Sequence, residues 1–243
     1  MATTTYLNLT NELLRRLNEV TIDQTDFANV RNIQALAKDA VNSSIRRILQ
    51  SAQEWPFTLT TKTATLVAGT GVYDFPADVS SVDWESFYIK QLSSKNNQPR
   101  KLEVVSYTEY LERYRYIDET AESGDYDVPI VVYQTQEEKF GVHPLPDDAY
   151  EIEYKYWAYP ADLSLFDDTV IIPDRFRHVI IDGAMMYMMR FRSNEQSAMV
   201  HQQAFDDGIR MMRRLLNDDN LYVRSTYIPN VGFTSTLVGP ING

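Results

Sequence analysis

The sequence of 243 residues contains no cysteine. This absence excludes a disulfide framework, a thiolate metal site and a cysteine nucleophile. Positive charge is also scarce, because 23 lysines and arginines stand against 34 aspartates and glutamates and give a net charge of −11. A protein that grips nucleic acid needs a basic surface, so this balance argues against such a role.

Long hydrophobic runs and cofactor-binding loops are missing as well. The most apolar run, Val179 to Met189, contains Asp182 and is too short to span a bilayer. The first residues lack the basic and apolar regions of a secretory signal. The nine glycines are scattered singly, so no phosphate-binding loop, dinucleotide fingerprint or nucleophile elbow is present in the sequence. We therefore expect no membrane association, no cofactor and a protein that is soluble and intracellular when made.

Three histidines and four pairs of neighbouring acids are the candidate catalytic groups. His178 lies between Asp174 and Asp182 at helical spacing, but a single imidazole among carboxylates favours surface ion pairs over a metal site. Neighbouring acids on a strand or helix point in different directions, and these pairs lie at expected turns and helix ends, where capping explains them. The pairs are Asp147-Asp148, Asp167-Asp168, Asp206-Asp207 and Asp218-Asp219. We expect no catalytic residue and no metal.

Apolar residues recur at steps of three and four in the C-terminal part of the chain. The segment from Pro173 to Leu216 predicts two consecutive helices, separated by a break where Ser193 and Gln196 form a capping box. The first helix has an apolar face made of Phe176, Ile180, Ala184, Tyr187 and Phe191, and the second continues with Met199, Phe205, Gly208, Met212 and Leu215 or Leu216.

The N-terminal part shows the same periodicity twice. It predicts one helix from Tyr6 to Val20 and a longer one from Val30 to Trp55, which Pro56 ends. These two helices and the two C-terminal ones are expected to form a four-helix bundle.

Between these helices, from residue 57 to 160, the apolar pattern changes to alternation. Strands are expected at Thr58 to Val67, Trp84 to Ile89, Ile130 to Tyr133 and Tyr150 to Tyr156, and Ser106 with Glu109 opens one short helix. We therefore predict an α+β fold with a small antiparallel β-domain inserted into the helical bundle, followed by an extended C-terminal tail. The predicted parts are residues 1–56 and 161–217 for the bundle, 57–160 for the β-rich domain and 218–243 for the tail.

Two groups of residues are candidate interfaces. Seven of the eight methionines fall between Met185 and Met212, and they suit either an adaptable contact surface or the filling of a core between helices. The candidates in this region are Gly183, Ala184, Met185, Met188 and Met212. The tail is too apolar for a solvated linker and too rich in proline and glycine for a long helix, so we expect it to dock on its own domain or, preferably, on a neighbouring subunit. The candidates there are Tyr222, Tyr227, Ile228, Phe233 and Leu237.

Four stretches, taken in order, resemble the head-to-tail adaptor proteins of tailed bacteriophages, in particular the tail tubular protein A type of short-tailed phages. They are the opening Tyr-Leu-Asn-Leu-Thr-Asn-Glu-Leu-Leu-Arg-Arg-Leu-Asn-Glu from Tyr6 to Glu19, Glu54-Trp55-Pro56-Phe57, the strand Tyr150 to Trp157 with Tyr159-Pro160, and Ile172-Pro173-Asp174-Arg175-Phe176 leading to Asp182-Gly183-Ala184. The resemblance implies a structural virion protein at the head-to-tail interface, which is present in the host cytoplasm before assembly. It also implies a dodecameric ring between the portal protein and the tail nozzle protein, through which DNA passes without specific binding during genome ejection.

Two other functions stay open at the level of sequence. Sixteen tyrosines and the paired acids suit a tail-associated carbohydrate-binding or cell-wall-degrading protein, in which aromatic side chains line a groove and acids act on a glycan. A monomeric binding module, whose tail folds back on itself, is the third alternative.

Overall fold

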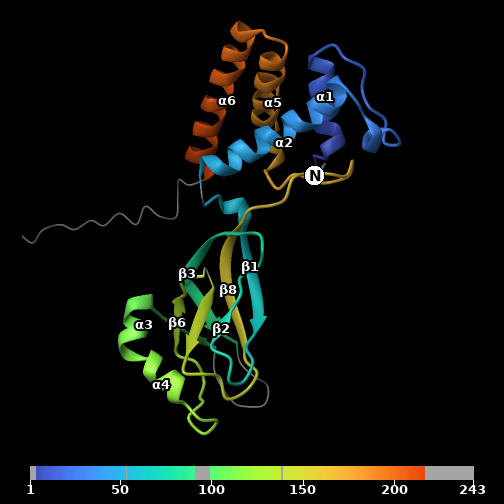
Figure 1. Ribbon diagram of the computed structural model, residues 1–243. Coiled ribbons are helices and arrows are strands. Elements are labelled where there is room, and N and C mark those ends of the chain that lie inside the picture. The colour runs from blue at the N-terminus through green and yellow to red at the C-terminus, as the bar shows by residue number, and fades with distance from the viewer. Residues whose placement is uncertain (1–3, 53, 91–98, 138, 217–243) are drawn as a thin grey trace, which may run out of the picture.

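In the computed structural model the chain forms a helical unit and a β-rich unit (Figure 1). Two segments connect the units, one after α2 and one after β8. The structure describes residues 4–52, 54–90, 99–137 and 139–216. The helical unit consists of α1 (Tyr6–Arg16), α2 (Ile33–Ser51), α5 (Arg177–Phe191) and α6 (Glu195–Leu216), with short 3-10 turns η1 (Phe27–Asn29) and η3 (Asp174–Phe176). The β-rich unit lies between α2 and α5 in sequence. The predicted α+β class is confirmed.

Helix α5 is the central element of the helical unit. It packs against α6, α2 and α1, and its buried residues include Val179, Ile180, Ile181 and Met186, which lie on different sides of the helix. Because α2 runs obliquely across α5 and α6 in Figure 1, the four helices share one core without all running side by side. A regular four-helix bundle is therefore not confirmed.

The first helix ends earlier than its apolar periodicity predicts. Asn18 adopts the left-handed conformation, with φ of 57°, and its backbone N–H donates to the Arg15 carbonyl at 3.2 Å while the Glu19 N–H donates to the Leu14 carbonyl at 2.9 Å. These two bonds make a Schellman cap, which turns the chain away from the helix axis. Val20, the last residue of the predicted helix, consequently lies beyond the helix and is 77% exposed, so the predicted end of this helix is wrong.

The break between α5 and α6 falls where it was predicted, but its chemistry differs. Ser193 has φ of 55° and its N–H donates to the Arg190 carbonyl at 2.9 Å, so it terminates α5 rather than capping α6. The side chain of Asn194 takes the capping role, because its Oδ1 accepts from the Ser197 N–H at 3.1 Å. The predicted Ser193–Gln196 capping box is therefore wrong.

The β-rich unit contains two four-stranded sheets. In the first, β1 (Leu59–Thr65), β8 (Glu151–Ala158), β3 (Val79–Ile89) and β4 (Arg100–Lys101) are all antiparallel. In the second, the order is β2 (Val72–Tyr73), β7 (Phe140–His143), β6 (Val131–Gln134) and β5 (Glu103–Val105). Strand β5 pairs with β6 in parallel, so the predicted antiparallel arrangement holds for every described pair except this one.

The two sheets enclose an aromatic core. Tyr150, Ile152, Tyr154 and Tyr156 are each at most 5% exposed, which confirms their shared strand face. The ring of Tyr154 stacks on that of Phe87 with centroids 4.8 Å apart. This core is separate from the helical one, which surrounds α5. The predicted division into domains stays a prediction.

Two short helices lie beside strand β6, on the outside of the β-rich unit (Figure 1). They are α3 (Tyr107–Arg113) and α4 (Arg115–Thr120). Ser106 caps α3, since its Oγ accepts from the Glu109 N–H at 3.2 Å. A further 3-10 turn, η2 (Pro56–Thr58), leads from the helical unit into β1.

Candidate assembly surfaces

The residues predicted for a helical interface lie inside the protomer. Ala184, Met185, Met188 and Met212 are between 0 and 5% exposed, and Gly183 is buried. A Cβ atom on Gly183 would lie 2.3 Å from Ser44 Oγ and 2.6 Å from Phe205 Cε2. These residues fill the core where α2, α5 and α6 converge. Of the two roles considered for the methionines, the packing within the protomer agrees with filling a core between helices. Their contact with a partner subunit stays a prediction without support from this packing.

The tail candidates lie outside the described residues. Tyr222, Tyr227, Ile228, Phe233 and Leu237 all follow Leu216, the last residue that the structure describes. Their role as a docking segment also stays a prediction.

A different set of apolar residues is exposed on α6. Val200 is 65% exposed, Met211 is 49% exposed and Leu215 is 55% exposed, and exposed Ala204 lies between the first two. Their spacing of i, i+4, i+11 and i+15 places them within about 60° of one another around the helix. We call these four residues the α6 stripe. A single exposed apolar residue is ordinary, but an aligned set on one helix is typical of a surface that packs against another protein.

Sequence periodicity did not separate this stripe from the core. The predicted apolar pattern of the last helix joined Met199 and Leu215, which are exposed, with Phe205 and Met212, which are buried. The sequence does contain a signal for this surface. Val200, Ala204, Met211 and Leu215 recur at helical spacing and form a second apolar face beside the one that packs in the core.

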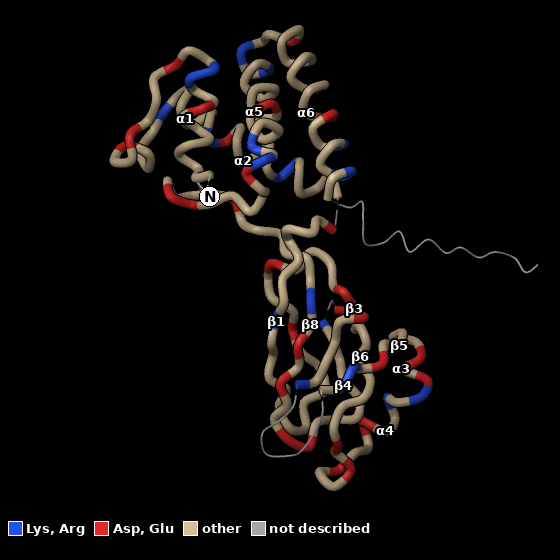
Figure 2. The backbone as a smooth tube through the Cα atoms, turned by 180° about the vertical axis from the view of Figure 1, so that it is seen from behind, with Lys and Arg blue, Asp and Glu red and all other residues tan. Residues whose placement is uncertain are grey.

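The charges around the stripe differ along α6. Asp206 pairs with Arg47 at 3.4 Å and Asp207 with Arg210 at 2.9 Å. Arg213 and Arg214 follow in the last turn and are both exposed. In Figure 2 the corresponding end of α6 carries basic residues. Within the described residues the acids beside the stripe pair with arginines, so the last described turn carries the positive charges of Arg213, which also donates to the Ser51 carbonyl, and Arg214.

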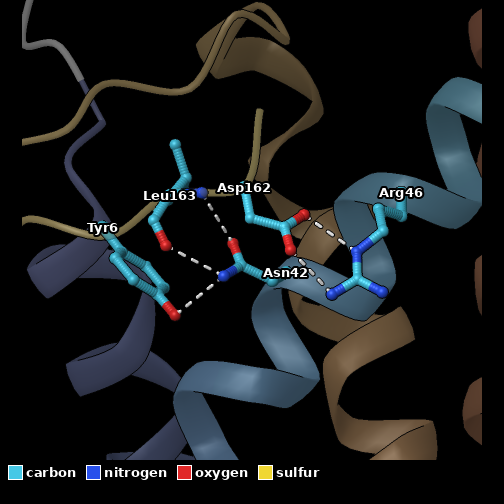
Figure 3. A network of polar contacts seen from close by, with 5 residues as sticks. All are labelled: Tyr6, Asn42, Arg46, Asp162 and Leu163. Carbon is cyan, nitrogen blue, oxygen red and sulfur yellow. Dashed lines mark hydrogen bonds and ion pairs between the residues drawn. The ribbon is translucent and has the colours of Figure 1, made fainter. Parts of the chain in front are cut away.

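A polar network fixes the returning segment, residues 159–172, onto α2 (Figure 3). The Asn42 Nδ2 donates to the Leu163 carbonyl at 3.0 Å and to the Tyr6 hydroxyl at 3.2 Å, and its Oδ1 accepts from the Leu163 N–H at 3.2 Å. Beside it, Arg46 makes a bidentate pair with Asp162, with both N···O distances 2.8 Å. The returning segment is thereby fastened to the core of the helical unit.

The surroundings of Tyr6 keep its phenol protonated. This side chain is 1% exposed, and its burial, reinforced by the nearby carboxylates of Asp39, Asp162 and Asp168, raises the pKa of the phenol well above its usual value. Tyr6 therefore acts as a neutral hydrogen-bonding partner within the core.

The two short helices are fastened to the second sheet by His143. Its Nδ1 lies 2.7 Å from Asp118 Oδ1, and the other carboxylate oxygen accepts from the Tyr110 hydroxyl at 3.1 Å. The Tyr110 ring stacks on Tyr133 with centroids 3.7 Å apart, and burial raises the pKa of both phenols. The histidine thus joins α4 to β7 through a largely buried hydrogen bond to Asp118.

Asp182, His201 and Asp168 make structural contacts, whereas Asp218 and Asp219 lie outside the described residues. Asp182 lies 3.6 Å from His201 and 3.7 Å from Arg16, so its contacts run to neighbouring helices instead of along α5 to His178. Asp168 accepts hydrogen bonds from the backbone N–H groups of Ser164 and Leu165, which lower its pKa. Within the described part of the chain, no group of three or more histidine and acidic side chains is arranged to hold a metal.

A hollow beside Trp84 bears on the glycan alternative. It measures about 590 Å³ and is lined by Asp74, Glu137 and Lys139 as well as Trp84. Lys139 lies 2.8 Å from Glu137 and 3.5 Å from Asp74, and this ion pair lowers the pKa of Glu137. A glycosidase needs an acid with a raised pKa facing a second carboxylate. These two acids share one lysine, so the hollow does not support glycan cleavage.

A model of one protein family matches most of the chain. The SU10 adaptor protein family matches residues 4–227, which include both units and the first part of the tail. Among curated proteins none matches the chain. None of the helices that the structure describes is both long and apolar enough to cross a membrane.

Proposed function

The chain belongs to the SU10 adaptor protein family, which makes it a structural adaptor of a bacteriophage and a component of the virion, and from that premise we propose that it forms the ring between the portal and the tail. In this proposal each copy contributes its helical unit to the ring wall. The observation that carries it is the family match from residue 4 to residue 227, which spans every described helix and strand.

The two-unit architecture supports such a role. The helical and β-rich units have separate cores, and two tied segments join them, of which residues 159–172 are fastened through Asn42. A protein of this kind offers two distinct surfaces, one on each unit. We propose that the helical unit meets the portal and the neighbouring copies, while the β-rich unit faces the tail nozzle.

The net charge supports passage of DNA without binding. Each copy carries a formal charge of −11, and a ring of such copies repels phosphate when its lumen is acidic, so DNA slides through with little adhesion. We propose twelve copies, following the resemblance to dodecameric connectors.

The C-terminal tail is the proposed docking segment. Tyr222, Tyr227, Ile228, Phe233 and Leu237 are large apolar residues in a sequence interrupted by proline and glycine. Such a segment adds contact area when it orders along a partner. We propose that it docks on the portal or on a neighbouring copy.

Deletion of residues 221–243 tests the tail separately from the rest of the chain. The shortened protein is expected to keep the thermal unfolding transition of the full chain, because both described cores end before residue 217. Its retention on immobilised portal protein should fall at least about tenfold, as the lost apolar contacts are worth more than about 1.4 kcal/mol. Equal retention of the two proteins would exclude the tail as the docking segment.

A further inference from the structure

The edge of the helical unit opposite α6 is formed by the loop between α1 and α2, residues 17–32. Figure 1 shows this loop and α6 at opposite edges of the helical unit, and Figure 2 shows the same from behind. In Figure 1 the loop starts near the turn between α5 and α6, where Glu19 pairs with Arg192, and runs down towards the level of the C-terminal end of α6. We call these residues the α1–α2 loop.

The loop is held firmly in place. The Ile22 N–H donates to Asn11 Oδ1 at 2.7 Å and its carbonyl accepts from Asn11 Nδ2 at 2.8 Å. Lys38 donates to the Phe27 carbonyl at 3.0 Å, and the side chains of Ile22 and Phe27 are at most 4% exposed. A loop fastened at several points is preorganised, so little entropy is lost when it binds a partner.

This fixed loop nevertheless presents an apolar side chain and two acids to solvent. Val20 is 77% exposed, and its carbonyl is held by Gln34 Nε2 at 3.2 Å. Asp23 and Asp26 are exposed, and no other described residue forms an ion pair with either of them. The loop thus combines an exposed valine with two acids that form no ion pair with the described residues, and exposed Arg31 near its end offsets part of their charge.

The α6 stripe combines the complementary features. Its apolar residues end at Leu215, next to exposed Arg213 and Arg214, and within the described residues Arg214 forms no ion pair. Two exposed acids beside a valine therefore match two arginines beside a leucine. Charge complementarity of this kind selects the partner and the register of an interface.

We infer that a second copy of this chain covers the α6 stripe, with the α1–α2 loop of one protomer seated on α6 of the next. Because the two surfaces are different and lie at opposite edges, the contact is head-to-tail, and repetition of it generates a ring when the rotation closes. This inference rests on the proposed function, for which it supplies the surfaces that join neighbouring subunits. Val20 lies against Leu215 and Met211, and Asp23 and Asp26 lie against Arg213 and Arg214.

The absence of cysteine makes a cross-linking test clean, since every thiol in a variant is an introduced one. The full-length chain carrying Val20→Cys and Leu215→Cys is assembled under the conditions in which the unsubstituted chain forms rings, with portal protein added if rings require it. It is then treated with a short bismaleimide. A denaturing gel is expected to show a ladder of covalent multimers, because each copy is joined to both of its neighbours.

Two control variants separate the outcomes. Val20→Cys combined with Lys62→Cys, an exposed position on β1, should give no ladder. Leu215→Cys alone should stay monomeric on the gel, and a strong dimer band would mean that α6 meets α6 and would overturn the inference. Rings that image intact but yield no ladder from the Val20→Cys and Leu215→Cys variant would also overturn it, while leaving the proposed function standing. Failure of the unsubstituted chain to form rings with the portal would overturn both.

Discussion

Gly183 shows how one missing side chain sets the packing of three helices. A Cβ atom there would lie 2.3 Å from Ser44 Oγ and 2.6 Å from the Phe205 ring, and the Ser44 hydroxyl donates to the Ile180 carbonyl at 2.8 Å. The close approach of α2, α5 and α6 therefore depends on glycine at this position.

Replacement of Gly183 by leucine is expected to overpack this contact and to lower the free energy of unfolding by about 1–3 kcal/mol. Urea denaturation followed by circular dichroism measures the loss. Gly124→Ala is the matched control, because a Cβ at Gly124 meets nothing within 4 Å, and it should leave the midpoint unchanged. A Gly183→Leu variant as stable as the unsubstituted chain would contradict the packing described here.

Asn42 and Arg46 lie one turn apart on α2 but should differ in importance. Asn42→Ala removes three hydrogen bonds and leaves the Leu163 N–H and carbonyl without their partner, which costs about 1–3 kcal/mol. Arg46→Ala breaks an ion pair whose two side chains are 48% and 49% exposed, which is worth at most about 1 kcal/mol. Equal losses in urea denaturation would show that the amide does not fasten the returning segment.

The aromatic core predicts a loss of stability at alkaline pH. Burial, together with the nearby Tyr156 and Asp78, raises the pKa of Tyr154 to about 12, compared with about 10 in the unfolded chain. A raised folded-state pKa means that the folded protein keeps the proton longer. This contribution to stability is therefore complete below pH 10 and is lost as the pH rises towards 12.

Tyr154→Phe should flatten this decline. The variant has no proton to lose at this position, so its stability is expected to fall less steeply between pH 10 and 12, by at most about 1.4 kcal/mol per pH unit. Denaturant midpoints at pH 9, 10 and 11 measure the two slopes. If the stability of the variant and of the unsubstituted chain falls equally with pH, Tyr154 is not the cause of the alkaline loss.

At the scale of elements, apolar periodicity predicted the long helices and one strand face well. It placed the end of the first helix too late and the cap between α5 and α6 on the wrong residue, because Asn18 and Ser193 enter the left-handed conformation and redirect the chain through local hydrogen bonds that periodicity does not record. Strand β7 was missed because its four residues are all buried, so they show no alternation. Strands β2 and β4 span two residues each, which is too short for a pattern.

The interface candidates show a different limit of sequence reasoning. Methionine and glycine on a helix suit both a core and a contact surface, and the structure places Met188 and Met212 in the core. The residues that are exposed are Val200, Leu215 and Val20. Their exposure depends on which side of each helix or loop the tertiary fold covers. That choice is made by long-range packing, so a single sequence does not reveal it.

The α6 surface gives a prediction for electrostatics. Arg214→Glu is expected to weaken subunit association by about tenfold at low salt, because it places a negative charge opposite the acids of the α1–α2 loop. Adding Asp23→Lys to the same chain should recover most of the lost association. At every subunit contact the loop then carries the positive charge and α6 the negative one. Sedimentation velocity at two salt concentrations measures the association.

Lys62→Glu on β1 is the control for this experiment, since it changes the net charge by the same amount on the other unit. It should leave association unchanged. If Lys62→Glu weakens association as much as Arg214→Glu, the effect comes from total charge rather than from this surface.

At the scale of the whole molecule, two separately packed units are connected by two short segments (Figure 1). The helical unit has complementary surfaces at opposite edges, and the β-rich unit extends away from it. This arrangement fits an adaptor that repeats around an axis and presents different units to the structures on either side. The acidic balance of −11 suits a channel for DNA that does not hold it.

The most direct test of the adaptor account is the mass of the assembly that purified chain forms with its portal protein, measured by light scattering and negative-stain imaging. The account predicts closed rings of about a dozen copies seated on the portal. A chain that stays monomeric in the presence of portal protein, at concentrations well above those in an infected cell, would contradict it.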